Sequence, residues 1–246
     1  MPESVVIIPT YNESENIARI IAAVLDQEHG FHVLVVDDGS PDGTGAIVKE
    51  LQAQYSGRLH LHERSGKLGL GTAYIAGFRW AMDHDYEYCF EMDADFSHNP
   101  QDLIRLLEPC RANVADATVG SRYTKGGAVS NWPKDRLILS YGASIYTRMI
   151  TWMPVKDPTA GFMCYRIDML RKLDLDKIRF IGYAFQIEMK YALRSLGARI
   201  VEVPITFIDR QEGTSKMSGG IISEAVFGVL RMRLKSFSNS YGHDNE

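Results

Sequence analysis

The stretch FEMDADFSH, at residues 90–98, places two aspartates one residue apart at the end of an apolar run. Side chains alternate between the two faces of an extended strand, so we expect Asp93 and Asp95 to project to the same side. Two carboxylates so placed repel each other unless they are solvated or share a hard cation such as Mg²⁺ or Mn²⁺, which often also binds substrate phosphates. The alternative is a solvated Asx turn that caps a helix after Asn99-Pro100. The motif alone leaves both interpretations open.

Short β-branched runs alternate with helical patterns on both sides of this stretch. The expected strands are VVIIP (5–9), HVLVVDD (32–38), RLHLHE (58–63), YEYCFEMD (86–93) and ATVGSR (117–122). Helical patterns fall near residues 14–28, 42–54, 70–84 and 100–112. This alternation predicts an α/β fold with a doubly wound, mostly parallel sheet flanked by helices. Ligands of such sheets bind at the carboxyl ends of the strands, beside the point where the strand order reverses.

Polar clusters follow four of the expected strands at their carboxyl ends. The clusters are PTYNE (9–13), DDGSPDG (37–43), ERSGKLGLG (63–71) and DAD (93–95). A solvated loop explains any one of them, but four clusters with acids, glycines and a basic pair at one edge favour a binding site.

The later half of the chain is less regular. It contains a Gly-rich turn at 125–136, a helical pattern at 137–152, the motif DPTAGF at 157–162, a helical pattern at 182–197 and a strand pattern at 198–207. Because no internal repeat or low-complexity linker interrupts it, we predict one domain over residues 1–218. We expect an amphipathic helix over 219–238 and a disordered tail over 239–246.

Composition narrows the class of protein. The chain has 246 residues, is 45% hydrophobic and carries a net charge of −4, which suits a folded globular protein and gives no general reason to expect nucleic acid as a partner. Its three cysteines lack zinc spacing, and we expect buried thiols in a reducing compartment. The sequence shows no signal peptide and no window of 18 uncharged apolar residues, so we expect a cytosolic protein or one that lies on a membrane from that side.

Common phosphate motifs do not fit the glycines near Lys67. A P-loop needs Ser or Thr after Gly-Lys, where this chain has Leu68, and a dinucleotide fingerprint needs a third glycine where it has Tyr74. The run DADFS resembles a dehalogenase-type phosphatase motif but follows the fourth strand rather than the first, and LVVDD could belong to a receiver domain, which is much shorter than this chain. The remaining interpretation is a nucleoside diphosphate held by a metal on Asp93 and Asp95, with the other acids around the nucleoside.

The sequence resembles the family 2 glycosyltransferases of GT-A fold, and most closely the dolichyl-phosphate (polyprenyl-phosphate) mannosyltransferases. The matching runs are IIPTYNE, VVDDGSPDGT, RSGKLGLGTAY (64–74), MDADFSHNP, GSRY (120–123), DPTAGF, FQIEMKY (185–191) and DRQEGTSK (209–216). The resemblance implies inverting transfer of mannose from GDP-mannose to a polyprenyl monophosphate, with Mg²⁺ or Mn²⁺, by a GT-A catalytic domain on the cytoplasmic face of a membrane. Some relatives also use small membrane-anchoring subunits.

The resemblance also implies roles for individual residues. It assigns the nucleotide sugar to Pro9, Tyr11, Glu13, Asp37, Asp38, Lys67, Asp93, Ala94, Arg210 and Lys216. It assigns the acceptor phosphate to Arg122, Arg136 and Ser140, and the metal to Asp93, Asp95 and Ser97, where relatives often have Gln in place of Ser97. The implied catalytic residues are Asp95, Arg122, Gln186 and Glu188. A turn acid at Asp37, a helix-surface acid at Glu188 and an exposed helix start at Arg136 are the alternatives.

The expected C-terminal helix mixes apolar residues with Arg231, Arg233 and Lys235 over 220–237. Such a helix lies in a membrane interface or packs its apolar stripe on the core, and the sequence does not distinguish these uses. Two rival functions also stay open, a polyprenyl-phosphate glucosyltransferase that uses UDP-glucose and a sugar-nucleotide-binding protein without turnover.

Overall fold

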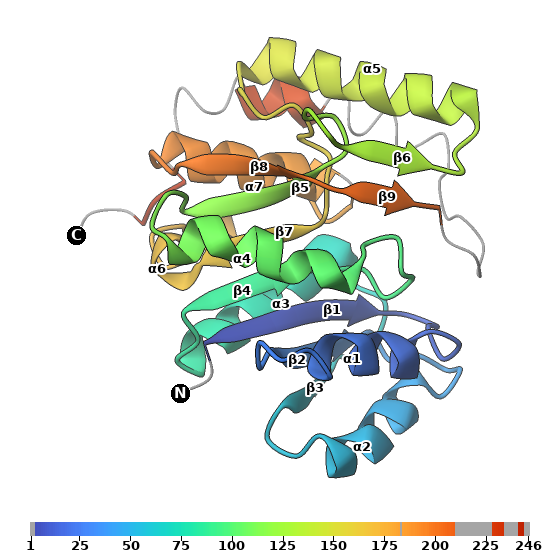
Figure 1. The fold of residues 1–246 in the computed structure, drawn as a ribbon. Helices are drawn as coiled ribbons and strands as arrows, with labels where there is room; N and C mark the ends of the chain where they lie inside the picture. The colour runs from blue at the N-terminus through green and yellow to red at the C-terminus, as the bar shows by residue number, and fades with distance from the viewer. Residues whose placement is uncertain (1–2, 183, 210–227, 234–240, 244–246) are drawn as a thin grey trace.

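The computed structural model describes residues 3–182, 184–209, 228–233 and 241–243 (Figure 1). A seven-stranded sheet forms its centre. In spatial order the strands are β3 (Leu59–Glu63), β2 (His32–Asp37), β1 (Ser4–Thr10), β4 (Tyr88–Glu91), β7 (Met163–Arg166), β5 (Ala117–Ser121) and β8 (Ile200–Pro204). All pairings are parallel except those of β7, which is antiparallel to β4 and β5. The predicted doubly wound, mostly parallel sheet is confirmed.

The strand order reverses beside β1, because β2 lies on one side of it and β4 on the other. The carboxyl ends of β1 and β4 therefore flank the switch point at which such sheets bind ligands. A separate two-stranded sheet pairs β6 (Ala128–Ser130) with β9 (Thr206–Ile208). The sequence did not predict β6 or β7, since both are too short for a periodic pattern and β7 is buried in the middle of the sheet.

Helices cover both faces of the sheet. One face packs against α1 (Ile17–Leu25), α2 (Thr44–Gln54) and α4 (Leu103–Arg111), which follows the 3-10 turn η1 (Pro100–Asp102). The other packs against α3 (Leu70–Asp83), α6 (Ile167–Leu170), η2 (Leu175–Lys177) and α7 (Ala184–Ser195). The long helix α5 (Lys134–Thr151) lies beyond the β8 edge in Figure 1. Alternation along β1 supplies both cores, with Val5 and Ile7 in one and Val6 and Ile8 in the other.

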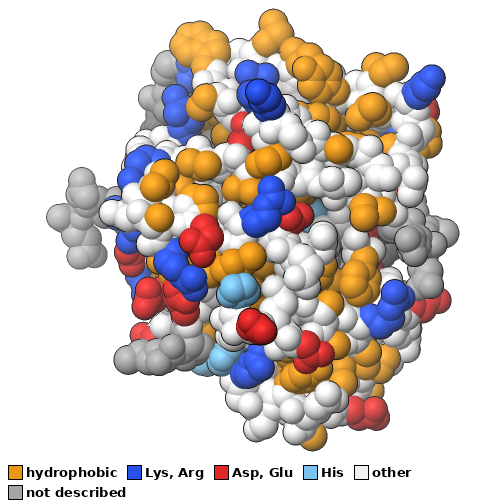
Figure 2. All heavy atoms as spheres, in the orientation of Figure 1, with side chains coloured by type: hydrophobic (Ala, Val, Ile, Leu, Met, Phe, Trp, Pro, Cys, Tyr) orange, Lys and Arg blue, Asp and Glu red, His pale blue; other side chains and the backbone are white. Residues whose placement is uncertain are grey.

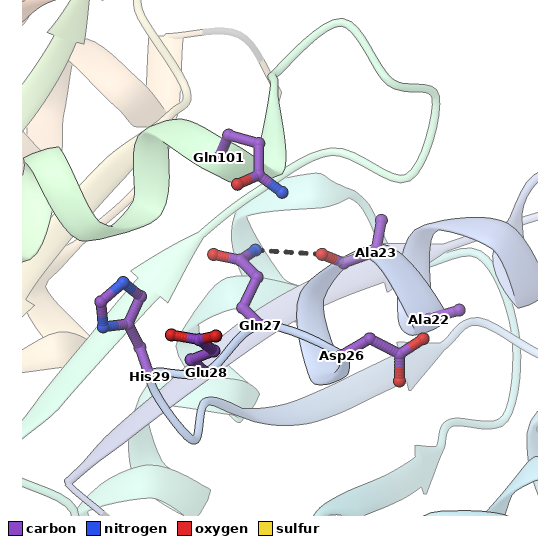
Figure 3. Close-up of a pocket in the computed structure, with 7 residues that line it drawn as sticks. All are labelled: Ala22, Ala23, Asp26, Gln27, Glu28, His29 and Gln101. Atoms are coloured by element: carbon purple, nitrogen blue, oxygen red, sulfur yellow. Dashed lines mark hydrogen bonds between the residues drawn. The ribbon is translucent and has the colours of Figure 1, made fainter.

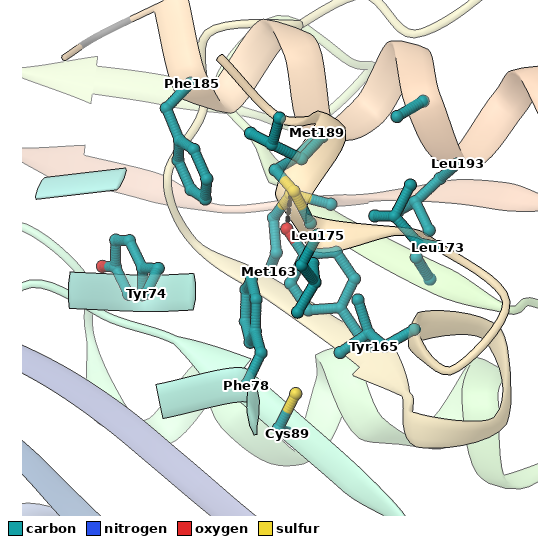
Figure 4. Packing of buried hydrophobic residues seen from close by; sticks show 14 of the residues in the cluster. Tyr74, Phe78, Cys89, Met163, Tyr165, Leu173, Leu175, Phe185, Met189 and Leu193 are labelled. Carbon is teal, nitrogen blue, oxygen red and sulfur yellow. Dashed lines mark hydrogen bonds between the residues drawn. The ribbon is translucent and has the colours of Figure 1, made fainter. Parts of the chain in front are cut away.

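Aromatic packing fixes the helix that runs beneath the carboxyl edge. In α3, Tyr74 stacks on Phe185 of α7 with ring centroids 6.0 Å apart, and Phe78 meets Tyr165 of β7 edge to face at 5.3 Å (Figure 4). The three cysteines are buried free thiols, as predicted. Within the described ranges, no helix is both long and apolar enough to cross a membrane.

Part of the C-terminal region is described. Residues 228–233 are helical, and Val229 and Met232 are buried, so these turns pack apolar side chains inward. The rest of the expected helix over 219–238 lies outside the described residues. The expected disordered tail is wrong for residues 241–243, because Gly242 bridges to Leu173 and the Tyr241 side chain is buried.

Candidate active site at the carboxyl edge of the sheet

The loops that follow β1 and β2 are tied together by hydrogen bonds. Backbone amides of the first donate to side chains of the second, each at 3.0 Å: Asn12 to Ser40 Oγ, Glu13 to Thr44 Oγ1 and Ser14 to Asp42 Oδ2. The predicted nucleotide-sugar residues Pro9, Tyr11 and Glu13 therefore lie beside Asp37 and Asp38 in one connected region.

Asp37 closes a turn at the end of β2. Its carboxylate accepts hydrogen bonds from Thr10 Oγ1 at 2.8 Å and from the backbone amide and hydroxyl of Ser40 at 2.9 and 2.6 Å. These contacts support the alternative interpretation of Asp37 as a turn acid, which leaves its contact with a nucleotide as a prediction.

Asp38 anchors the Gly-rich loop that follows β3. Arg64 Nε donates to its Oδ1 at 2.6 Å, and the backbone amide of Leu68 donates to its Oδ2 at 3.1 Å. The Arg64–Asp38 pair is nearly buried, with 8% of each side chain exposed. The same loop holds the Lys67 ammonium 4.9 Å from the centre of the Tyr11 ring. The structure thus brings together two predicted donor residues, Tyr11 and Lys67, through an arginine to which sequence reasoning gave no role.

The two aspartates of DADFSH lie in a loop rather than in a strand, because β4 already ends at Glu91. The expectation that they share a face of an extended strand is therefore wrong. Tyr74 Oη donates to Asp93 Oδ1 at 3.5 Å, and the Asp93 amide donates to His98 Nδ1 at 3.3 Å. Burial lowers the pKa of His98 to about 4, so the ring is neutral and can accept this bond.

The alternative of a helix cap applies to a different residue. Asn99 Oδ1 accepts the hydrogen bond from the amide of Gln101 at the start of η1, so the cap does not use the aspartates. One oxygen of Asp95 accepts the Ser97 amide at 3.0 Å in an Asx turn. The Asp93 side chain, 40% exposed, stays open to solvent.

The donor set of this loop suits a hard divalent cation. Asp93 and Asp95 offer carboxylate oxygens, Ser97 is buried beside them with a hydroxyl, and Ala94 between the acids is buried. Among the described residues, no group of three or more His, Cys, Asp or Glu side chains is arranged to hold a metal. A pair of carboxylates fits Mg²⁺ or Mn²⁺, which commonly complete their coordination with water and substrate phosphates.

A cavity of about 330 Å³ opens beside this loop. Its lining residues are Asn16, Arg19, Asp95, Phe96, Asn99, Pro100, Ile208 and Asp209. It therefore joins the loop of Asp93 and Asp95 to the end of β9. A second hollow, shown in Figure 3, lies beside the end of α1 and is lined by Ala22, Ala23, Asp26, Gln27, Glu28, His29 and Gln101, none of which is a predicted site residue.

Arg122 is held inside the protein by a bidentate ion pair. Its Nε and Nη2 donate to Asp157 at 2.7 and 2.6 Å, and Nη2 also donates to Thr159 Oγ1 at 2.8 Å. The side chains of Arg122 and Asp157 are 9% and 0% exposed. Burial by itself raises the pKa of Asp157, but the hydrogen bonds and charge of Arg122 outweigh it and lower that pKa.

The predicted acceptor residues contact two neighbouring aromatic side chains, Trp132 and Tyr123. The guanidinium carbon of Arg122 lies 5.5 Å from the centre of the Trp132 ring, and that of Arg136 lies 4.1 Å from the same ring. Tyr123 Oη donates to Ser140 Oγ at 2.7 Å. Arg122, Arg136 and Ser140 thus lie in one cluster, and their contact with an acceptor phosphate stays a prediction. Sequence reasoning missed Trp132 because an isolated tryptophan in a turn gives no signal.

Arg136 is part of this cluster and also lies in the first turn of α5, where Lys134 and Asp135 are exposed and the Arg136 side chain is half-buried. Its Nη1 donates to Asp209 Oδ1 at 2.9 Å, and both side chains are 26% exposed. Asp209 also lines the cavity beside Asp95. Arg210 and Lys216, which the resemblance predicts to clamp the donor diphosphate, lie outside the described residues.

Gln186 takes part in a buried network under the site. Its Nε2 donates to Glu91 Oε2 at 2.5 Å, and Tyr165 Oη donates to Glu91 Oε1 at 2.8 Å. Lys190 Nζ donates to the carbonyl oxygen of Ala160 at 2.6 Å. Burial raises the pKa of Glu91 and lowers that of Lys190. The network links the end of β4, the DPTAGF segment and α7, and no local sequence pattern indicated it.

Glu188 is not the helix-surface acid that the alternative interpretation describes, because the residue is only 2% exposed. Its Oε2 accepts the backbone amides of Arg179 and Phe180, each at 2.8 Å, and its Oε1 accepts Tyr241 Oη at 3.2 Å. Burial raises the pKa of Glu188. Its predicted contact with the sugar stays a prediction.

The sequence of this chain is similar to those of known proteins. Residues 5–174 match the model of glycosyl transferase family 2. The chain is 48% identical over 232 residues to polyprenol monophosphomannose synthase of Mycolicibacterium smegmatis, covering 94% of this chain and 87% of that protein. It is also 48% identical over 228 residues to undecaprenyl-phosphate mannosyltransferase of Micrococcus luteus, covering 93% of each.

A solved structure shares the fold. Glucosyl-3-phosphoglycerate synthase from Mycobacterium tuberculosis, in complex with Mn²⁺, uridine diphosphate and glucosyl-3-phosphoglycerate, superposes with a TM-score of 0.66 over 94% of this chain and 80% of that one, at 19% identity. The predicted fold and family are confirmed. By its sequence, this chain belongs to glycosyltransferase family 2.

Proposed function

We propose that this protein transfers mannose from GDP-mannose to a polyprenyl monophosphate, with inversion, at the cytoplasmic face of a membrane. One observation carries the proposal furthest: a single cavity is lined by Asp95 of the carboxylate pair and by Asp209, the ion-pair partner of Arg136. This geometry supports a site for a metal-bound diphosphate that adjoins a site for an acceptor phosphate. The names of the two curated relatives give the lipid phosphate acceptor and, in one case, mannosyl transfer.

The chain's own residues have distinct tasks in this reaction. Asp93 and Asp95, with Ser97, hold the divalent cation, which when bound neutralises the diphosphate of the leaving nucleotide. Tyr11, Glu13, Lys67 and the clamp residues Arg210 and Lys216 bind the donor.

The acceptor needs orientation more than activation. A phosphate monoester has a second pKa of about 6, so it is largely ionised at neutral pH and needs no strong general base. Arg122, Arg136 and Ser140 orient it, since guanidinium groups bind phosphate oxygens with paired hydrogen bonds. Gln186 supports the sugar from the buried side.

The helix α5 carries an exposed apolar stripe that fits a membrane surface. Ile138, Tyr141, Ile145, Met149 and Trp152, which directly follows the helix, recur at helical spacing and are 40% to 75% exposed. Hydrophobic side chains gather over this part of the molecule in Figure 2. An apolar stripe normally faces the core, so its exposure marks an interaction surface. Because Arg136 and Ser140 lie on the same helix, we propose that α5 rests on the bilayer that contains the acceptor.

Vesicle sedimentation tests this membrane contact. The double variant Ile138→Asp, Met149→Asp should bind phosphatidylglycerol vesicles at least about tenfold more weakly, because each charge must leave water to enter the interface. Val114→Asp is the matched control, since Val114 is equally apolar and 59% exposed but lies outside α5. Equal binding of both variants and the wild type would rule out α5 as the contact; a small anchoring subunit would then be the alternative.

A transfer assay tests the reaction itself. The protein is incubated with Mg²⁺ or Mn²⁺, a short polyprenyl phosphate and either labelled GDP-mannose or labelled UDP-glucose. We expect organic-soluble label from GDP-mannose only. Label transferred from UDP-glucose would mean that the protein is a glucosyltransferase and not a mannosyltransferase. Binding of either nucleotide sugar without transfer would indicate a binding protein.

A further inference from the structure

We propose that Tyr241, near the C-terminus, is a positioning residue: through Glu188 it holds the loop on which the donor-binding Gly-rich loop rests. The kinetic part of this proposal rests on the proposed function, whereas its structural part does not. Sequence reasoning placed Tyr241 in a disordered tail and gave it no role.

The first step is the docking of the C-terminal segment. The Asp174 amide donates to the carbonyl oxygen of Tyr241 at 2.9 Å, and Lys177 Nζ donates to that of Gly242 at 2.7 Å. The Tyr241 ring lies edge to face with Tyr191 of α7, with centroids 6.2 Å apart. These contacts come from two separate elements, so the position of Tyr241 is fixed from both sides.

The second step is the buried carboxylate. Tyr241 Oη donates to Glu188 Oε1, while Glu188 Oε2 accepts the amides of Arg179 and Phe180. Hydrogen bonds to a buried carboxylate are among the stronger ones, and loss of one leaves a desolvated oxygen without its donor. The tyrosine hydroxyl therefore stabilises the carboxylate orientation that ties the 179–180 backbone to α7.

The third step joins this backbone to the donor-binding loop. The Gly71 amide donates to the carbonyl oxygen of Ile181 at 2.9 Å. The approach is close, since a Cβ added at Gly71 would lie 2.8 Å from the Phe180 carbonyl oxygen and one at Gly69 would lie 3.2 Å from that of Ile181. The loop over 64–71 thus rests directly on residues 180–181, and it carries Lys67.

Contacts therefore run without a break from the C-terminal segment to the donor site. Both carboxylate oxygens of Glu188 accept hydrogen bonds within the protein, which suits a residue that acts through the loop rather than on the sugar. A shift of the 179–181 backbone would move the support of Lys67 while leaving the acceptor cluster around Trp132 in place.

Tyr241→Phe tests the hydroxyl alone, because it keeps the buried ring. By hydrogen–deuterium exchange we expect faster exchange of the amides in 179–181 and of Gly71, with exchange of the strand amides unchanged. Calorimetry with GDP and Mg²⁺ should show about fivefold weaker binding, a size typical of effects transmitted through packed contacts. In the transfer assay the donor KM should rise by a similar factor, with kcat and the acceptor KM unchanged.

Two further variants make the outcome decisive. His243→Ala is the control, since the exposed His243 ring lies 3.2 Å from the carbonyl oxygen of Arg171, and this variant should change none of these quantities. Glu188→Gln should reproduce the loop exchange, and combining it with Tyr241→Phe should add little. Unchanged exchange at 179–181 and Gly71 in Tyr241→Phe, or additive effects of the pair, would overturn the proposal. A wild type without transfer would refute only the proposed function, because the exchange experiment needs no turnover.

Discussion

Two sites at the carboxyl edge of the sheet differ in how deeply their charged side chains are buried. On the proposed donor side, Asp93 lies in a loop with 40% of its side chain exposed. On the acceptor side, Arg122 is buried with Asp157 before any phosphate arrives. A partly exposed carboxylate is stabilised by water, whereas a buried charge is tolerated only when it is paired. Substitution of the aspartates in the 93–97 loop should therefore reduce activity, whereas breaking the buried Arg122–Asp157 pair should also reduce stability.

The largest effect should come from Asp95→Ala. Removing a carboxylate that holds the metal should lower metal-dependent transfer by at least about 10³-fold, the scale of losing one strong stabiliser of developing charge. The thermal midpoint should stay close to that of the wild type, because the hydrogen bond that Asp95 accepts from the Ser97 amide lies within one turn of the same loop. Glu50→Ala, at an exposed position of α2, is the control. Undiminished turnover would refute the metal assignment and therefore also the contrast between the two sites.

A second prediction compares two ion pairs on the acceptor side. Asp157→Asn leaves the buried Arg122 without its counter-ion and should lower the free energy of unfolding by about 3–5 kcal/mol in urea titrations. Asp209→Asn removes the partner of Arg136, but both side chains are 26% exposed and the loss should be at most about 1 kcal/mol. Equal losses would mean that burial does not distinguish the two pairs.

A third prediction concerns the support of the donor-binding loop. Gly71→Ala forces a methyl group to within 2.8 Å of the Phe180 carbonyl oxygen and should lower the free energy of unfolding by about 1–3 kcal/mol. Gly66→Ala, in the same loop, has no atom within 4 Å of the added carbon and should change it by less than about 0.5 kcal/mol. Thermal denaturation measures both, and tolerance of Gly71→Ala would show that the two loops are not in firm contact.

The smallest effect is expected at the opposite, amino edge of the sheet. Burial, then the charges of His60 and Arg58, lower the pKa of His32 from 6.5 to about 4. As the pH falls, His32 therefore takes up a proton in the unfolded chain before it does so in the folded protein. Its contribution to stability is complete above pH 6.5 and is lost as the pH falls toward 4. His32→Gln should flatten the fall of the thermal midpoint over this interval relative to the wild type. If the thermal midpoints of the variant and the wild type fell in parallel with pH, the lowered pKa of His32 would be contradicted.

The donor side was largely predictable because its residues follow strands directly. A loop after a parallel strand must lie at the carboxyl edge, so the positions of Tyr11, Asp38 and Asp93 followed from the strand pattern alone. The acceptor side was predictable only through family resemblance, since Arg122, Trp132 and Arg136 come together around one ring by long-range packing. Asp157 begins the matching run DPTAGF, but no local pattern indicated its pairing with Arg122, because the two residues are 35 positions apart.

The sequence by itself determined the alternation of strands and helices, the edge of the sheet that carries the site and the carboxylate pair within it. These features depend on periodicity and on neighbours along the chain, which can be followed residue by residue. Only the tertiary structure decided that β7 runs antiparallel inside the sheet, that Arg64 pairs with Asp38 and that Glu188 joins Tyr241 to the 179–181 backbone. Each of these depends on which distant groups are buried together, and burial sets whether a charge needs a partner.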